Sequence, residues 1–287
     1  MRELVFALLA AFLLAGCSVQ KLAIRTTSGI FSYGIEAIYA EPDLPTAEIA
    51  VASNLKLLEG FYRADPGNET LQLFLTQGFA AYSLAFLETD APDRASLFYL
   101  RARDYGFEML ENTTGAFKKG IPDKEADFVA RLAEVKKDDL PALFWTAFAW
   151  GGWVNLNRDN PQAVFDLNKV KAMMNRCLEL DDTYFFGAAY LFFGSINGSI
   201  PRMLGGDPEK AGEQFDRVIE INDGAFLLAH VYKARYYAAT TLNEALFDEL
   251  LATVEAAPMD ILPDYELLTA LAKQRARELK AQKDELL

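Results

Sequence analysis

Apolar residues recur at helical spacing along nearly all of the chain after residue 21. The clearest stretch is 207–222, where Ala211, Phe215, Val218 and Ile219 share one stripe and charged residues cover the remaining surface. A stripe of this kind predicts an amphipathic helix with one face toward a core.

Local signals mark both ends of this helix. Asp207 is a natural N-cap, and Pro208 suits the first helical position because its missing N–H costs nothing there. Residues 222–224 (Asn-Asp-Gly) are expected to end the helix. The same reasoning predicts amphipathic helices at 166–180 and 243–257.

Segments of a different kind lie between these helices. Residues 142–156 and 183–201 contain no charge, and 225–239 is rich in aromatic residues. A helix that is apolar on all sides is buried or faces lipid. Each segment is followed after a short loop by an amphipathic helix, and glycines (Gly151-Gly152 and Gly194) interrupt two of them. We therefore predict inner helices of a soluble array and not membrane spans.

The alternation of inner and outer helices predicts stacked hairpins. Residues 176–182 parallel residues 217–223 at a longer offset than a tetratricopeptide (TPR) repeat. An earlier pair is predicted at 69–88 and 92–111, and residues 264–285 form a charged C-terminal helix suited to capping an array. The expected fold is all-α, a TPR-like helical-hairpin solenoid with a charged C-terminal capping helix.

The first residues predict export. The apolar run from Leu4 to Gly16 is too short to span a bilayer, which takes roughly 20 residues, but it suits a signal peptide. The run ends Leu14-Ala15-Gly16-Cys17, a small-residue cleavage site with a thiol that can carry lipid. The predicted organisation is a signal peptide at 1–16, a lipidated N-terminus and tether at 17–26, and one α-helical domain at 27–287. The alternative is an ordinary secretory signal with a chance cysteine.

A lipid anchor at Cys17 would place the protein on the periplasmic side of a bacterial membrane. Ser18 is not the aspartate that favours inner-membrane retention, so the outer membrane is favoured. The net charge of −13 argues against nucleic-acid partners and against flat binding to an anionic leaflet. Membrane contact is therefore expected to come from the lipid.

The titratable residues argue against catalysis. His230 is the only histidine and lies in an apolar stretch, which indicates a core residue with its hydrogen bonds satisfied. Cys177 is left without a disulfide partner and is expected to be a buried small hydrophobe. Acidic residues fall on outer faces, and the sequence has no phosphate loop, metal-spaced cluster or nucleophile elbow. We predict no enzyme, no cofactor and no metal.

A ligand cleft is a second possibility beside simple packing. All three tryptophans lie in 142–156, where Trp145 and Trp153 share roughly one face. Such a face is typical of an apolar cleft, or of a core that aromatic residues dominate. Arg202 could meet a ligand carboxylate or cap the preceding helix. The candidate cleft residues are Trp145, Phe148, Trp153, Tyr184, Phe192, Asn197, Arg202, Met203, Tyr232 and Tyr236.

The Leu14–Cys17 sequence resembles the lipobox of bacterial lipoproteins. Together with this lipobox, residues 143–151 and 193–211 resemble the TatT family, the T component of TRAP transporters. The resemblance implies homotrimers of TPR-like protomers, each with an apolar cavity or pore. It also implies docking of a periplasmic solute-binding protein, the P component, and delivery of a hydrophobic or amphipathic ligand.

Two other functions remain open from the residues. A TPR-like lipoprotein scaffold of an envelope assembly would bind no ligand, and its inner helices would be packed without a cavity. An envelope hydrolase would need two close carboxylates on inner helices.

Overall fold

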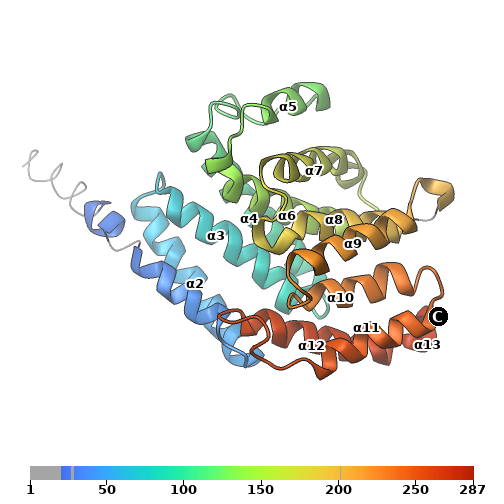
Figure 1. The fold of residues 1–287 in the computed structure, drawn as a ribbon. Helices are drawn as coiled ribbons and strands as arrows, with labels where there is room; N and C mark the ends of the chain where they lie inside the picture. The colour runs from blue at the N-terminus through green and yellow to red at the C-terminus, as the bar shows by residue number, and fades with distance from the viewer. Residues whose placement is uncertain (1–20, 27–28, 201) are drawn as a thin grey trace, which may run out of the picture.

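The computed structural model describes residues 21–26, 29–200 and 202–287, and every regular element in these ranges is helical, as the periodicity predicted (Figure 1). The predicted signal peptide and Cys17 lie outside the described residues. The elements are α2 (Leu44–Ala64), α3 (Glu69–Tyr82), η1 (Ser83–Leu87), α4 (Pro92–Thr113), α5 (Glu125–Leu132), η2 (Lys137–Asp139), α6 (Leu140–Leu156), α7 (Pro161–Leu180), α8 (Tyr184–Ser199), η3 (Arg202–Leu204), α9 (Pro208–Ile221), α10 (Leu228–Lys233), η4 (Ala234–Ala238), α11 (Glu244–Ala256), α12 (Glu266–Ala281) and α13 (Lys283–Leu286).

The local signals place two of the three predicted outer helices correctly. Asp207 caps α9 by accepting a hydrogen bond from the Lys210 N–H at 3.0 Å, and Pro208 opens the helix. Asn243 caps α11 in the same way, through the N–H of Leu246. The remaining predicted outer helix, α7, begins several residues before the predicted start at 166, because Asn160 caps it. Such caps satisfy N–H groups that have no partner within the helix.

The segment before α2 is also helical. Residues 21–26 and 29–39 are helical, although part of this region was expected to be a tether. The Arg25 guanidinium donates a 2.7 Å hydrogen bond to the Asp65 carboxylate at the end of α2. This ion pair holds the pKa of Asp65 below its usual range, and it ties the N-terminal residues to the domain.

The glycines of α6 do not interrupt the helix, contrary to the sequence interpretation. Gly151 and Gly152 lie inside α6, which runs unbroken to Leu156. A Cβ on Gly152 would overlap the Tyr99 ring on α4, and one on Gly151 would press on Phe192 of α8. These glycines therefore allow close approach between helices, and that contact outweighs their weak helix propensity.

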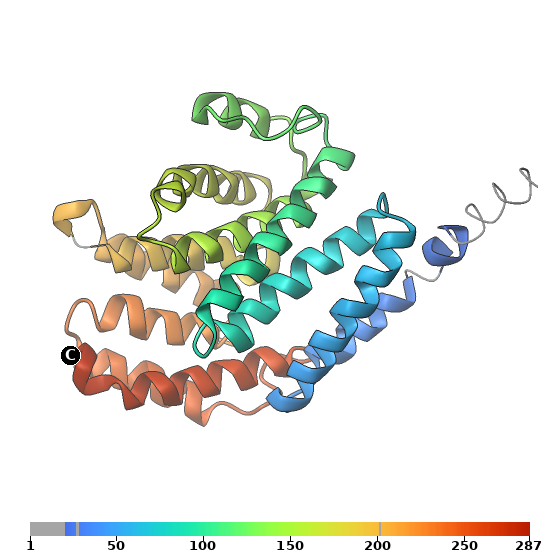
Figure 2. The same ribbon diagram turned by 180° about the vertical axis from the view of Figure 1, so that it is seen from behind.

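The long helices pack side by side in chain order, from α2 against α3 through to α11 against α12, while the short helix α5 packs on α7 (Figures 1 and 2). The last long helix, α12, also packs against α2, near the start of the described domain. The array therefore curves until its two ends meet. The predicted terminal helix is present, and it packs against α2, α10 and α11.

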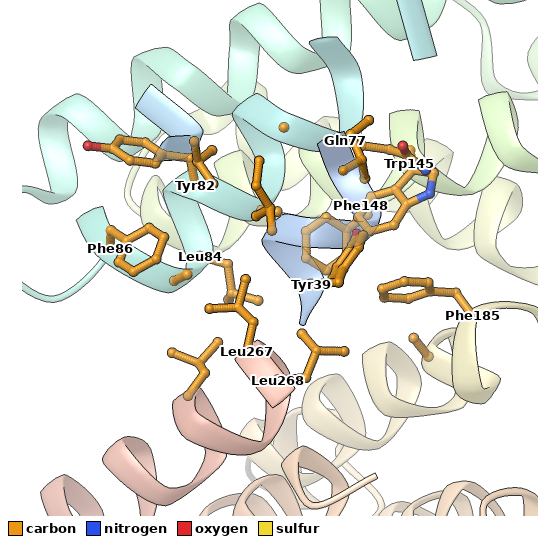
Figure 3. Close-up of a pocket in the computed structure, with 18 of the residues that line it drawn as sticks. Tyr39, Gln77, Tyr82, Leu84, Phe86, Trp145, Phe148, Phe185, Leu267 and Leu268 are labelled. Atoms are coloured by element: carbon orange, nitrogen blue, oxygen red, sulfur yellow. The ribbon is translucent and has the colours of Figure 1, made fainter. Parts of the chain in front are cut away.

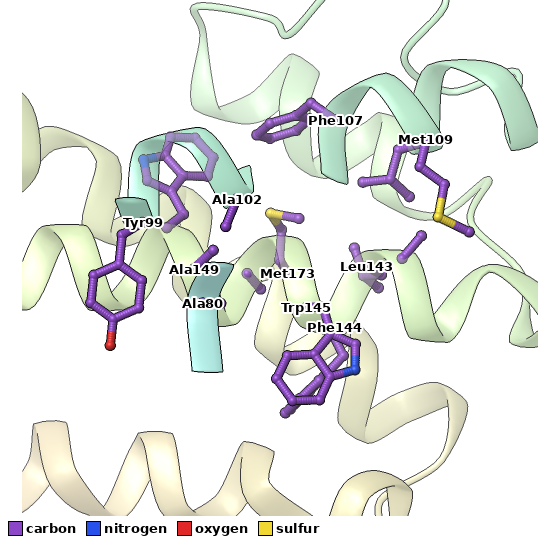
Figure 4. Packing of buried hydrophobic residues seen from close by; sticks show 14 of the residues in the cluster. Ala80, Tyr99, Ala102, Phe107, Met109, Leu143, Phe144, Trp145, Ala149 and Met173 are labelled. Atoms are coloured by element: carbon purple, nitrogen blue, oxygen red, sulfur yellow. The ribbon is translucent and has the colours of Figure 1, made fainter. Parts of the chain in front are cut away.

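The interior divides into two clusters of buried apolar residues. The larger lies among α2, α3, α4, α6 and α7, and Figure 4 shows Trp145, Phe144 and Leu143 of α6 packed within it. The smaller lies among α9, α10, α11 and α12. The segment Glu69–Leu87 is long and apolar enough to cross a membrane, but half of its most apolar window is buried in the protein. We therefore interpret this segment as a helix of the protein core.

Candidate functional site

A chamber of about 140 Å³ opens where the two apolar clusters face each other. Its walls come from the helix at 29–39 and from α2, α3, η1, α6, α8, α10 and α12. Figure 3 shows Leu267 and Leu268 of α12 facing Trp145 and Phe148 of α6 across this space. No charged residue lines this first chamber among the described residues.

Aromatic contacts fix the α6 wall of the first chamber. Trp145 and Phe148 are three residues apart on α6, so they lie on one face of the helix, with ring centroids 5.4 Å apart. Phe185 of α8 meets the Trp145 ring edge-on, at 4.6 Å and 67°. Such tilted pairs are the preferred geometry of aromatic rings and hold them in defined positions.

A left-handed turn at the start of α8 brings Phe185 to this wall. Phe185, Phe186 and Gly187 have φ values of 44°, 62° and 73°. Left-handed backbone is costly for residues with a Cβ, so surrounding contacts must hold it. Phe186 stacks on Phe226 at 4.9 Å and meets Tyr265 edge-on at 5.0 Å. The turn thus sends Phe185 to the larger cluster and the first chamber, and Phe186 to the smaller cluster.

A second chamber, of about 270 Å³, adjoins the first. Residues that line both chambers form the boundary between them: Leu84, Phe148, Ala188, Leu191 and Tyr232. The second chamber also contains polar side chains, among them Glu88, Tyr99, Asn155, Arg158 and Tyr236. We refer to the two chambers together as the cavity, which has an apolar end and a more polar end.

Glu88 is the acidic residue of the cavity wall. Its Oε1 accepts a 2.6 Å hydrogen bond from the Tyr99 hydroxyl. Burial raises the pKa of the Glu88 carboxyl, while the Tyr99 hydrogen bond and the Arg275 and Arg235 charges oppose that rise. Burial and the adjacent Glu88 also raise the pKa of both Tyr99 and Tyr232. Both tyrosines therefore remain neutral near pH 7.

Two π-helical turns border the cavity. In η1 the Glu88 N–H donates to the carbonyl of Ser83, and in η4 the Ala239 N–H donates to that of Ala234. A π-turn holds one extra residue, and such turns are frequent at functional sites. Leu84 of η1 and Tyr236 of η4 both line the second chamber.

Five of the ten predicted cleft residues line the cavity: Trp145, Phe148, Phe192, Tyr232 and Tyr236. The other five lie elsewhere. Trp153 is buried outside the chambers, although it was expected to share the cleft face with Trp145. Tyr184 packs edge-on against Phe144. Asn197 donates to Gln214, Arg202 pairs with Glu209, and Met203 is 89% exposed.

Sequence reasoning missed the walls supplied by distant segments. The sequence pattern places Glu88 in a predicted helical pair and Leu267, Leu268 and Leu271 in the predicted capping helix. It indicates no role for any of them in a cleft. The apolar positions 267, 268 and 271 were a usable signal, because such a stripe must face some other element. Which element it faces depends on the closure of α12 onto α2.

The other singled-out residues are structural. Cys177 is buried, as predicted, and burial raises the pKa of its thiol. His230 is also buried, but its Nδ1 has no hydrogen-bond partner among the described residues, contrary to the expected satisfied histidine. Glu88 is the single carboxylate among the described cavity-lining residues. The pair of carboxylates that a hydrolase would need is therefore not found there.

These features define an all-α protein with an apolar cavity between packed helices. The family model of the TRAP transporter T-component, TAtT, matches residues 40–287, and the chain belongs to this family. It is thus an accessory component of a TRAP transporter, a class with a transport-associated role. It is also 23% identical to an uncharacterised protein of Treponema pallidum (strain Nichols), over 96% of this chain and 94% of that protein.

Proposed function

We propose that this chain is a membrane-tethered periplasmic accessory protein that holds a hydrophobic or amphipathic ligand in the cavity and docks a solute-binding protein. The observation that carries the proposal is the cavity itself, with Trp145, Phe148 and Phe185 on its walls. A scaffold without a ligand would be expected to pack these inner helices together.

The chemistry of the first chamber favours an apolar occupant. Ordered water in a protein needs two to four polar partners, whereas apolar cavities stay dry. The chamber offers only scattered groups, such as Tyr39 and Gln77, among aliphatic and aromatic side chains. Covering this apolar surface with a ligand gains roughly 25 cal/mol for each Å² removed from water.

The family and the lipobox support the remaining parts of the proposal. Membership of the TRAP transporter T-component family supports a solute-binding protein, the P component, as the docking partner. The resemblance stated above supports a homotrimer. The Leu14–Cys17 sequence supports a lipid anchor at Cys17, and Ser18 favours the outer membrane.

The test is native mass spectrometry of the chain from residue 18, purified gently from cells. We expect a trimer that retains the mass of a small hydrophobic or amphipathic molecule. A bare monomer that takes up no apolar probe would contradict the proposal and favour the scaffold.

A filled cavity provides the internal control. Ala188 lines both chambers, so Ala188→Phe places a ring at their boundary and should abolish the retained mass. Ala252→Phe adds the same ring on the exposed side of α11 and should leave the mass unchanged. Equal retention by both variants would show that the bound molecule lies outside the cavity.

A further inference from the structure

The described lining of the cavity carries two charged residues, and these differ in their exposure to solvent. Among the described lining residues, Glu88 is the only acid and Arg158 the only base. Arg158 is exposed, and its guanidinium donates to Asn155, which is also exposed. Glu88 is half-buried beside the fully enclosed Tyr99. The charge within the cavity is therefore that of a carboxyl group.

One oxygen of this carboxyl group has no protein partner. Tyr99 donates to Oε1, while Oε2 accepts no hydrogen bond from the described residues. The neighbouring guanidiniums have other partners: Arg275 donates to the Leu84 carbonyl and to Glu278, and Arg235 lies over the Tyr236 ring at 5.6 Å. Because Glu88 is only half-buried, this oxygen is open to a donor from a ligand, and a charge-assisted hydrogen bond to it would be stabilising.

The π-turn places Glu88 on the wall of the second chamber. Successive residues of an α-helix are rotated by about 100°. The extra residue of η1, marked by the Glu88 N–H to Ser83 carbonyl hydrogen bond of 3.0 Å, therefore turns Glu88 relative to the regular α3 face. Leu84, at the start of the same turn, lines both chambers. The local distortion thus puts a polar group and an apolar group on one wall.

We propose that Glu88 is the head-group site of the cavity and selects an amphipathic molecule with a protonated amine, whose apolar chain lies in the first chamber. This inference rests on the proposed ligand-holding function. An ammonium group can donate to Oε2 in a charge-assisted hydrogen bond, which is stronger than a neutral one. A carboxylate head would instead meet a like charge and be disfavoured.

The test compares decylammonium, decanoate and decanol by calorimetric titration at physiological salt. These probes share one chain length and differ in the head group. We expect the wild type to bind decylammonium at least tenfold more tightly than decanoate. Glu88→Gln keeps an acceptor for Tyr99 and the side-chain shape but removes the charge, and should reduce this ratio to near one. Glu213→Gln makes the same change at an exposed carboxylate of α9 that lines neither chamber, and should preserve the ratio.

The outcomes separate the two proposals. If decanol binds but the wild type does not prefer decylammonium, or if Glu88→Gln keeps the preference, the head-group site is wrong and ligand holding stands. If none of the three probes binds, the ligand-holding function fails and the head-group site fails with it. Equal loss of preference in Glu213→Gln would assign selection to the overall charge of the protein and overturn the role of Glu88.

Discussion

The Arg275 guanidinium donates a 3.0 Å hydrogen bond from Nη2 to the backbone carbonyl of Leu84, 191 residues earlier in the chain. Its Nη1 donates to Thr89 and, at 2.9 Å, to Glu278. Leu84 belongs to the π-turn η1 and lines both chambers. The contact therefore ties the C-terminal helix α12 to the cavity wall.

Arg275→Gln should lower the free energy of unfolding by about 1–3 kcal/mol, since hydrogen bonds to charged groups contribute on this scale. The measurement is chemical denaturation followed by circular dichroism. Arg277→Gln removes an exposed guanidinium two residues away on the same helix and should change stability by less than about 0.5 kcal/mol. Equal effects of the two substitutions would show that the link to Leu84 contributes nothing.

Gly152→Ala should destabilise the protein. The added Cβ would overlap the Tyr99 ring, and overpacking of a core costs roughly 1–3 kcal/mol. Tyr99 would also move away from Glu88, so binding in the second chamber should weaken. Thermal unfolding and probe titration measure the two effects. Gly60→Ala, where a Cβ meets nothing within 4 Å, should be neutral or stabilising.

The left-handed turn at the start of α8 predicts a cost for Gly187→Ala. Gly187 has a φ of 73°, and an added Cβ would lie 2.7 Å from Ile221 Cδ1. We expect a loss of at least about 1 kcal/mol, because left-handed backbone alone costs an L-residue roughly 1–2 kcal/mol. Gly205 has a φ of 94° and open space around it. Gly205→Ala therefore measures the cost of the left-handed backbone without a steric contact. A Gly187 effect no larger than the Gly205 effect would mean that the Ile221 contact is unimportant.

His230 predicts a pH dependence of stability. Burial and the Lys233 charge lower its pKa in the folded protein, while Asp216 opposes this. The unfolded chain, with a histidine pKa near 6.5, therefore takes up the proton first as the pH falls. This contribution to stability is fully present above about pH 6.5 and is lost as the pH falls through the window below it.

His230→Gln should remove that contribution, and urea unfolding between pH 8 and pH 5 measures it. Glu88 has a raised pKa, so its own contribution has the opposite sign and falls as the pH rises. The difference between wild type and variant isolates the histidine because Glu88 is common to both. Parallel stability curves for the two proteins would contradict the prediction. As the only histidine, His230 can also be titrated directly by NMR.

Much of the fold follows from local signals, whereas the site does so only in part. The N-caps of α9 and α11 are the residues directly before each helix, so the starts of both helices were predictable from the sequence. Trp145 and Phe148 were identified as cleft candidates because aromatic residues cluster in an uncharged helix. The prediction that Trp153 lies in the cleft was wrong. Sharing a helix face with Trp145 does not determine which neighbouring helix covers each turn of α6. Tyr184 was misplaced because the left-handed turn that follows it redirects the chain.

The helical class, the alternation of buried and amphipathic helices and the burial of Cys177 follow from periodicity or composition within a short window, so they can be predicted without a structure. The other features depend on how distant parts of the chain pack together. The closure of α12 onto α2, the meeting of Leu267 with Trp145 across the first chamber and the exposure of Glu88 to the second all join residues far apart in sequence. Such contacts depend on how each helix is rotated and where the chain ends meet, and no local pattern encodes either.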